Sequence, residues 1–270
     1  MKFTVVTTFN SAGYELYGRR MIQTFLQNWP QEVQLVVYAE DCVVAESAEN
    51  LQVVDLSTAS VELTAFKQQW KHVPKATGNV SDDPVRSRRK DAGKGFKWDA
   101  VRFAHKVYAI FHCAKSAQTD CLLWMDGDTV CHSPITVADL ERLCPPDKDI
   151  CFLGRKNKYT ECGLYAMNLQ SLRTQDFLTQ FQQYYDQAEQ GIFTLDEWHD
   201  SFVFDAVRKQ HPLMELDWSG HLVSGEGHPL INSEWGAYLD HLKGSRKDLG
   251  RSKNKDLLVN RLEKYWLQHS

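Results

Sequence analysis

The chain has 270 residues, a formal net charge of -4 at pH 7 and a hydrophobic share of 43%. This composition is that of a globular protein long enough to form one large domain, and its acidity gives no general attraction to nucleic acid or to anionic membranes. No run of about 18 apolar residues is present, so we expect no membrane-spanning helix. Seven cysteines without a Cys-x-x-Cys pair favour reduced thiols and a cytoplasmic protein.

The first half of the chain alternates strand and helix patterns. β-Branched residues at 3–8 predict a first strand, and apolar residues at helical spacing predict a helix over 14–29 that Pro30 ends. Residues 33–39 and 51–56 predict two further strands. Residues 72–97 carry repeated Pro and Gly and six cations between 86 and 97, which predicts a long basic loop.

The second half continues the alternation. An amphipathic helix is expected over 98–115, and strands over 122–125, 149–154 and 163–169. Three more helices are expected over 171–190, 198–209 and 255–268. Strands that alternate with helices are typical of a doubly wound α/β protein.

Two carboxylates follow the strand predicted over 122–125 and are separated by one glycine, in the stretch Asp126-Gly127-Asp128. In extended backbone, side chains two positions apart point the same way, so both carboxylates can bind one cation. Such oxygen ligands suit Mg²⁺, Mn²⁺ or Ca²⁺, and Gly127 lets a ligand approach the backbone. The alternative is a hairpin turn, because Asp-Gly between apolar runs is a strong hairpin signal.

A second short motif lies at 241–247, where HLKGSRK has the spacing H-x-x-G-x-x-K. Together with the D-x-D stretch and its preceding strand, it resembles the retaining GT-A-fold glycosyltransferases of the glycogenin and lipopolysaccharide galactosyltransferase type (family 8-like). On its own, this second motif is also consistent with a helix that ends at a glycine cap.

The resemblance implies a GT-A (Rossmann-like) α/β fold, with a mixed, mostly parallel central sheet flanked by helices. It implies one domain over 1–270, with a nucleotide-binding half at 1–130, a half for the acceptor and donor sugar at 131–250 and a C-terminal helix within 251–270.

The resemblance also implies roles for individual residues. Asp126, Asp128 and His241 would hold Mn²⁺ or Mg²⁺, while Gly244 and Lys247 would meet the donor diphosphate. The remaining donor-binding candidates are Gly127, the residues Thr7, Thr8 and Asn10 after the first strand, and Arg102 and Lys106 on the helix over 98–115. For Arg102 and Lys106 the alternative is a solvated helix face.

Two acids are the catalytic candidates. Glu161 opens the stretch ECGLYAMN, which resembles the family's segment lining the sugar pocket; it would bind donor hydroxyls or face the anomeric carbon, unless it is a loop carboxylate. Asp200 stands where the family contacts the donor sugar; it would bind sugar hydroxyls or act as a general base. The alternative for Asp200 is an acid that stabilises a helix N-terminus.

We therefore expect a metal-dependent glycosyltransferase that moves a hexose from a nucleotide-diphosphate sugar, by default UDP, to a glycan, a lipid-linked acceptor or another hydroxyl. The resemblance implies retention of configuration, whereas a general base at Asp200 would suit inversion. Two alternatives stay open. One is glycosylation of modified DNA guided by the basic loop 86–97, and the other is a metal-dependent nucleotidyl- or phosphotransferase, which would need a third acid beside the pair.

Overall fold

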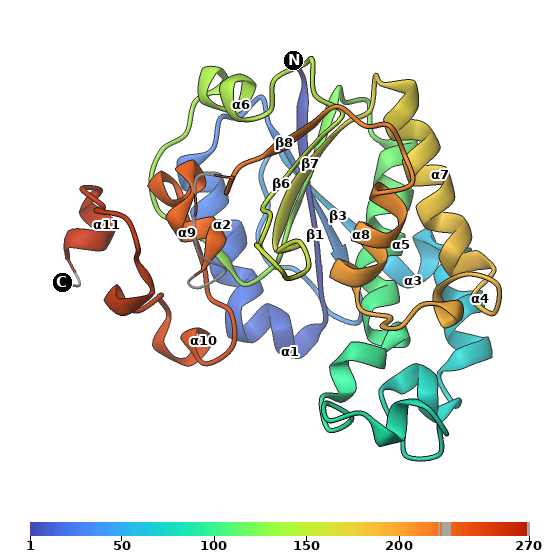
Figure 1. Cartoon of the computed structure of the whole chain (residues 1–270). Coiled ribbons are helices and arrows are strands. Elements are labelled where there is room, and N and C mark those ends of the chain that lie inside the picture. Colours follow the sequence, from blue (N-terminus) through green and yellow to red (C-terminus); the bar gives the residue numbers. More distant parts are fainter. Residues whose placement is uncertain (221, 223–227, 269–270) are drawn as a thin grey trace.

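The computed structural model describes residues 1–220, 222 and 228–268. A seven-stranded sheet runs through the molecule in the order β3-β2-β1-β4-β7-β6-β8, and helices cover both of its faces (Figure 1). The strands of this sheet are β1 (Phe3–Phe9), β2 (Gln34–Ala39), β3 (Leu51–Asp55), β4 (Cys121–Met125), β6 (Ile150–Phe152), β7 (Leu164–Asn168) and β8 (Glu215–Asp217).

The sheet is mixed and mostly parallel. Strands β3, β2, β1 and β4 are parallel neighbours, and β6 is parallel to β8. Only β7 runs against its neighbours β4 and β6. This confirms the α/β sheet expected from the sequence. Strand β8 was not expected, because its sequence ELD offers one apolar residue and no alternation to read.

The two faces of the sheet have separate apolar cores. Alternate residues of a strand point to opposite faces, so Val6 packs in one core and Val5 in the other. The first core holds α3 (Leu56–Ala59), α4 (Val61–Trp70), α5 (Ala100–Ser116), α7 (Leu172–Asp186) and α8 (Asp200–Arg208). The second holds α2 (Arg19–Asn28), α6 (Val137–Leu143), α9 (Pro229–Asn232) and α11 (Lys264–Leu267).

A small second sheet brings distant segments together. Strand β5 (Thr129–Cys131) pairs antiparallel with β9 (Leu239–His241), and Thr129 lies opposite His241. Both strands have only three residues, so neither has a periodicity that marks it in the sequence. This pairing places position 241 beside the end of β4.

The basic loop 72–97 is folded against the body of the protein. Three 3₁₀ turns run through it, at Pro74–Thr77, Arg86–Arg88 and Gly95–Trp98. Ala76, Val80 and Trp98 are buried in the first core. In Figure 1 this segment lies below the N-terminal end of α5.

The helix predicted over 255–268 is wrong. Only a 3₁₀ turn at Asn254–Asp256 and the four-residue helix α11 form there. Between them, the Leu258 amide donates to Asn232 Oδ1 and Arg261 donates to the Ile231 carbonyl. Trp266 is buried, but Leu258, Leu262 and Leu267 are exposed, so the apolar spacing of this segment does not mark a buried helix face. Tertiary hydrogen bonds replace those of a helix.

The remaining helices are α1 (Ser11–Gly13), a π-helical turn at Tyr14–Gly18 that joins it to α2, and α10 (Arg246–Leu249). Among the described residues, no helix has both the length and the hydropathy needed to cross a bilayer. All seven cysteines are free thiols.

Candidate active site

The two aspartates of the D-x-D stretch meet His241 at the end of β4. One ligand atom from each of Asp126, Asp128 and His241 lies within 4.8 Å of the other two. His241 Nε2 is 3.1 Å from Asp128 Oδ1 and 3.5 Å from Asp126 Oδ2. The hairpin interpretation is wrong, because β4 pairs with β1 and β7 while β5 pairs with β9. The helix interpretation of residue 241 is also wrong, because it ends strand β9.

This donor set fits a divalent cation. Two carboxylates and an imidazole are hard and intermediate ligands that suit Mn²⁺ and Mg²⁺, and the imidazole favours Mn²⁺. Cationic partners surround the acids: Lys247 Nζ lies 3.0 Å from Asp128 Oδ2 and 4.7 Å from the centre of the Tyr17 ring. Burial would raise the pKa of Asp128, but the charges on His241 and Lys247 outweigh it and lower that pKa.

The backbone at Gly163, directly before β7, packs closely against the imidazole of His241. A Cβ atom added at Gly163 would lie 2.4 Å from His241 Cε1 and 2.7 Å from its Nδ1. Burial would lower the pKa of His241, but hydrogen bonding and the charge of Asp128 raise it. The carboxylates therefore attract a positive charge to this position.

Lys106 connects the metal group to Asp200. Its ammonium lies 3.1 Å from Asp126 Oδ1 and 2.7 Å from Asp200 Oδ2, and it also donates to the Cys162 carbonyl. Lys106 is 8% exposed, so the solvated-face interpretation is wrong for this residue. Burial would lower the pKa of Lys106, but Asp126 and Asp200 raise it well above its ordinary value. Arg102, one turn earlier on α5, is exposed.

The two catalytic candidates are buried and ion-paired. Glu161 Oε2 lies 2.9 Å from Lys243 Nζ and 3.2 Å from Arg155 Nη1. Burial would raise the pKa of Glu161, but Lys243, His241 and Arg155 lower it to about 2. Burial would likewise raise the pKa of Asp200, but Lys106 lowers it.

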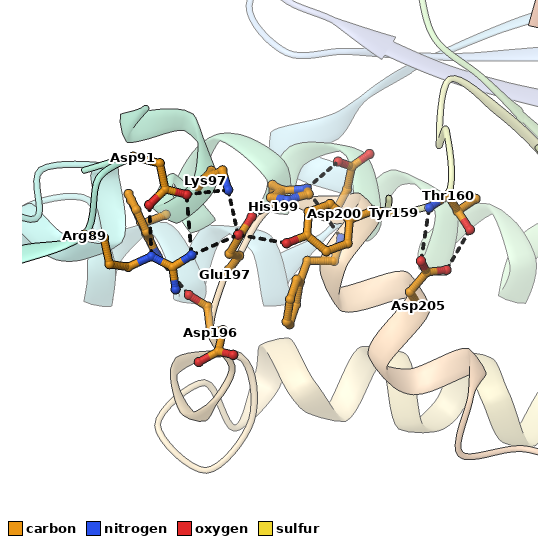
Figure 2. Close-up of polar contacts among 12 residues, drawn as sticks. Arg89, Asp91, Lys97, Tyr159, Thr160, Asp196, Glu197, His199, Asp200 and Asp205 are labelled. Atoms are coloured by element: carbon orange, nitrogen blue, oxygen red, sulfur yellow. Dashed lines mark hydrogen bonds and ion pairs between the residues drawn. The ribbon is translucent and has the colours of Figure 1, made fainter. Parts of the chain in front are cut away.

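A charged network beside α8 was not found from the sequence, and Glu197 lies at its centre (Figure 2). Lys97 Nζ lies 2.7 Å from Glu197 Oε1, and Tyr159 donates to the same oxygen at 2.8 Å. His199 Nε2 is 3.0 Å from Glu197 Oε2, and His199 caps the helix that begins at Asp200. The Trp-His-Asp-Ser stretch indicated this helix start, but Glu197 carried no motif.

Several cations of the basic loop are paired with acids of the loop or with Glu197. Arg86 binds Asp83 at 3.0 Å, and Arg89 lies 3.0 Å from Asp91 and 3.5 Å from Glu197. These guanidinium groups are neutralised by acids of this protein and are less available to the phosphates of a nucleic acid.

A cleft of about 1640 Å³ contains most of the predicted site residues. The predicted residues that line it are Arg102, Lys106, Asp126, Asp128, Glu161, Asp200, His241, Gly244 and Lys247. Gly244 has a φ of +64°, a backbone conformation that favours glycine.

Four donor-binding candidates do not line this cleft. Thr7 is fully buried, and the Thr8 hydroxyl donates to the Tyr38 carbonyl at 2.7 Å. Asn10 caps the start of α1, where its Oδ1 accepts a hydrogen bond from the Gly13 amide. A Cβ atom at Gly127 would lie 3.0 Å from the Phe9 ring, so this glycine is packed against an apolar side chain. Their donor contacts stay predictions.

No protein-family model matches the sequence, and no curated protein matches it. Among solved structures, the chain is similar to the galactosyltransferase LgtC in complex with donor and acceptor sugar analogues, at 10% identity and a TM-score of 0.49 over 99% of this chain and 100% of that one. It is similar to mouse xyloside xylosyltransferase 1 at 12% identity and a TM-score of 0.46, over 80% of this chain and 85% of that one.

A third similar structure is the bifunctional glycosyltransferase WbbM, at 11% identity and a TM-score of 0.47. The match covers 80% of this chain and only 38% of the WbbM chain. Structural similarity at these identities and TM-scores does not identify a function by itself. The functional argument rests on the site residues.

Proposed function

We propose that the protein is a metal-dependent glycosyltransferase that moves a hexose from a nucleotide-diphosphate sugar, by default a UDP-sugar, to a hydroxyl of a glycan or lipid-linked acceptor with retention of configuration. The observation that carries the proposal is the convergence of Asp126 and Asp128 with His241, from more than a hundred positions later, within 4.8 Å. UDP is the default nucleotide of this proposal, and the panel of donors described below tests it.

Asp126, Asp128 and His241 would hold the metal. When bound, Mn²⁺ or Mg²⁺ supplies charge that stabilises the diphosphate as it leaves. Lys247, at 3.0 Å from Asp128, is the nearby cation that could move to a phosphate oxygen. The exposed guanidinium of Arg102 lines the same cleft and supplies a second positive charge.

The electrostatics of Asp200 and Glu161 favour retention over inversion. A general base works best with a pKa near the working pH, but both acids have lowered pKa values and strong cationic partners. They are suited to stay ionised and to stabilise positive charge at the anomeric carbon. In the proposed step the bond from the anomeric carbon to the diphosphate breaks, the acceptor oxygen bonds to that carbon, and the hydroxyl proton passes to a diphosphate oxygen.

The two alternatives find less support. A nucleotidyl- or phosphotransferase with two metal ions would want a third carboxylate beside the pair, whereas the third member of the described group is an imidazole. A DNA acceptor guided by residues 86–97 is disfavoured by the net charge of -4 on the chain. Within this loop Arg86, Arg89 and Lys97 are ion-paired, which leaves Arg88, Lys90 and Lys94 as its exposed cations without an ion pair in the described part of the chain.

The test is release of nucleoside diphosphate from a panel of nucleotide sugars with Mn²⁺ and no acceptor. We expect release from one donor, a loss of at least roughly 100-fold in Asp128→Ala, and no change in Asp82→Ala, an exposed acid of the same size. No release from any donor, together with no thermal stabilisation by any nucleotide, would contradict the proposal.

A further inference from the structure

The cleft is rich in positive charge although the chain is acidic. Eleven of the described residues that line it are Lys or Arg and six are Asp or Glu, whereas the whole chain has a net charge of -4. A cleft with an excess of one sign attracts ligands of the opposite sign.

Part of this excess is not neutralised. Six cations of the cleft are paired with carboxylates: Lys97, Lys106, Arg155, Arg208, Lys243 and Lys247. Four other cations are exposed and have no carboxylate within ion-pair distance in the described part of the chain: Lys94, Arg102, Lys156 and Lys209. Arg102 lies on the same helix as Lys106, so we assign it to binding the diphosphate at the metal group.

Lys209 lies too far along α8 to share that role. Asp200 opens this helix and is tied through Lys106 to Asp126, so the start of α8 adjoins the metal group. The nine residues of α8 rise roughly 13 Å before Lys209 follows. A diphosphate held by the metal does not span that distance.

Lys156 lines the cleft from a loop whose two ends contact the second half of α8. The loop that carries it follows β6, whose last residue Phe152 has its ring 4.1 Å from the guanidinium of Arg208 at the end of α8. At the other end of this loop, Thr160 binds Asp205 of α8 through both its amide and its hydroxyl (Figure 2). Both ends of the loop are therefore anchored on the second half of α8, and Lys156 in the loop and Lys209 after the helix line the cleft on this side.

We propose that the acceptor is a sugar or glycan that carries a phosphate group, and that Lys156 and Lys209 bind this phosphate. This inference rests on the proposed function, because it makes this side of the cleft the acceptor side. Two ammonium groups match the charge of a phosphomonoester, which is near -2 at neutral pH. A nucleic acid is a weaker candidate, because the chain as a whole has a net charge of -4 and does not attract a polyanion in general.

Calorimetric titration of the protein without metal or donor tests this inference. The probes are glucose 6-phosphate and glucose. We expect the wild type to bind glucose 6-phosphate and to bind glucose at least roughly tenfold more weakly. We expect K156E/K209E to bind the phosphorylated sugar at least roughly tenfold more weakly than the wild type, and K156A/K209A to fall between them.

The matched control is K71E/K115E, which makes the same change of charge at two exposed lysines outside the cleft. It should bind glucose 6-phosphate as the wild type does. Equal binding of both sugars, or equal weakening in both pairs of variants, would overturn the inference. So would tighter binding of a single-stranded oligonucleotide whose affinity falls steeply with salt.

The result is separable from the test of the proposed function, which measures release of nucleoside diphosphate with Mn²⁺. An enzyme that releases nucleotide but shows no effect of Lys156 and Lys209 would retain its proposed activity and lose the phosphorylated acceptor. Binding of the phosphorylated sugar without any nucleotide release would support the phosphate site and contradict the proposed activity.

Discussion

The ammonium of Lys106 lies 2.7 Å from Asp200 and 3.1 Å from Asp126, so one buried lysine is shared by a candidate catalytic acid and a candidate metal ligand. The lysine reaches both acids from α5, while Asp126 follows β4 and Asp200 opens α8. Lys106 thereby joins α5 and the end of β4 to α8, which comes from the second half of the chain.

Replacing Lys106 with Met keeps the length of the side chain and removes its charge. Two buried or half-buried carboxylates then lose their shared partner, so we expect unfolding free energy to fall by about 3–5 kcal/mol. Urea denaturation followed by circular dichroism measures this loss. The double variant K106M/D200N should recover part of it, because it removes one of the uncompensated charges. A loss below about 1 kcal/mol in K106M would show that the ion pairs do not hold this base together.

The position of Lys106 illustrates what a sequence pattern leaves open. Its spacing from Arg102 placed both cations on one face of a helix, and that helix forms over Ala100–Ser116. Whether such a face is solvated depends on segments far away in the chain. Cys162 and Asp200 bind Lys106, whereas Arg102 is exposed.

The metal group was predictable for a different reason. The two aspartates follow a strongly apolar strand, so the local pattern placed them at its carboxyl end. His241 was joined to them only through the resemblance of its motif, because the strands that bring it there have three residues each. Strand pairs of this length are specified by tertiary packing, and no local propensity records them.

Gly163 makes room for the imidazole of His241, so Gly163→Ala should weaken metal binding. The added Cβ would lie 2.4 Å from His241 Cε1, and the ring has to move to accommodate it. We expect the dissociation constant for Mn²⁺ to rise by roughly 10–100-fold, as for loss of groups that orient a ligand. Electron paramagnetic resonance of free Mn²⁺ measures the change.

Gly93→Ala is the matched control for this substitution. A Cβ atom at Gly93 meets nothing within 4 Å, so the affinity for Mn²⁺ should be unaffected. An unchanged affinity in Gly163→Ala, with the fold intact by circular dichroism, would mean that His241 does not reach the metal through this arrangement.

Asp240 ties the C-terminal segment to strand β9. Its carboxylate accepts hydrogen bonds from the amide and hydroxyl of Ser252 and from the Tyr265 hydroxyl, at 2.6–2.8 Å. Asp240→Ala removes the acceptor of the buried amide and hydroxyl of Ser252, so we expect unfolding free energy to fall by about 1–3 kcal/mol. Hydrogen exchange should show faster exchange of the Ser252 amide. An unchanged rate there would mean that Asp240 does not hold the segment.

Glu197 is expected to give the protein a stability that depends on pH. Burial alone would raise the pKa of Glu197, but hydrogen bonds from His199, Lys97 and Tyr159 lower it to about 2, from an ordinary value of 4.5. The fold therefore favours the ionised carboxylate. Its contribution is complete above the unfolded-state pKa and is lost as the pH falls through the folded-state pKa.

We expect Glu197→Gln to be less stable than the wild type by about 2 kcal/mol at pH 7. This difference should shrink between about pH 5 and pH 2 and disappear below it. The other charged groups around Glu197, including Arg89 and Asp91, are the same in both proteins, so the difference between the two curves isolates this carboxyl. Urea denaturation at a series of pH values measures both curves, with Glu32→Gln, an exposed glutamate, as the control that should show no difference at any pH. A difference between wild type and Glu197→Gln that stays constant down to pH 2 would show that the network binds Glu197 through its shape and not through its charge.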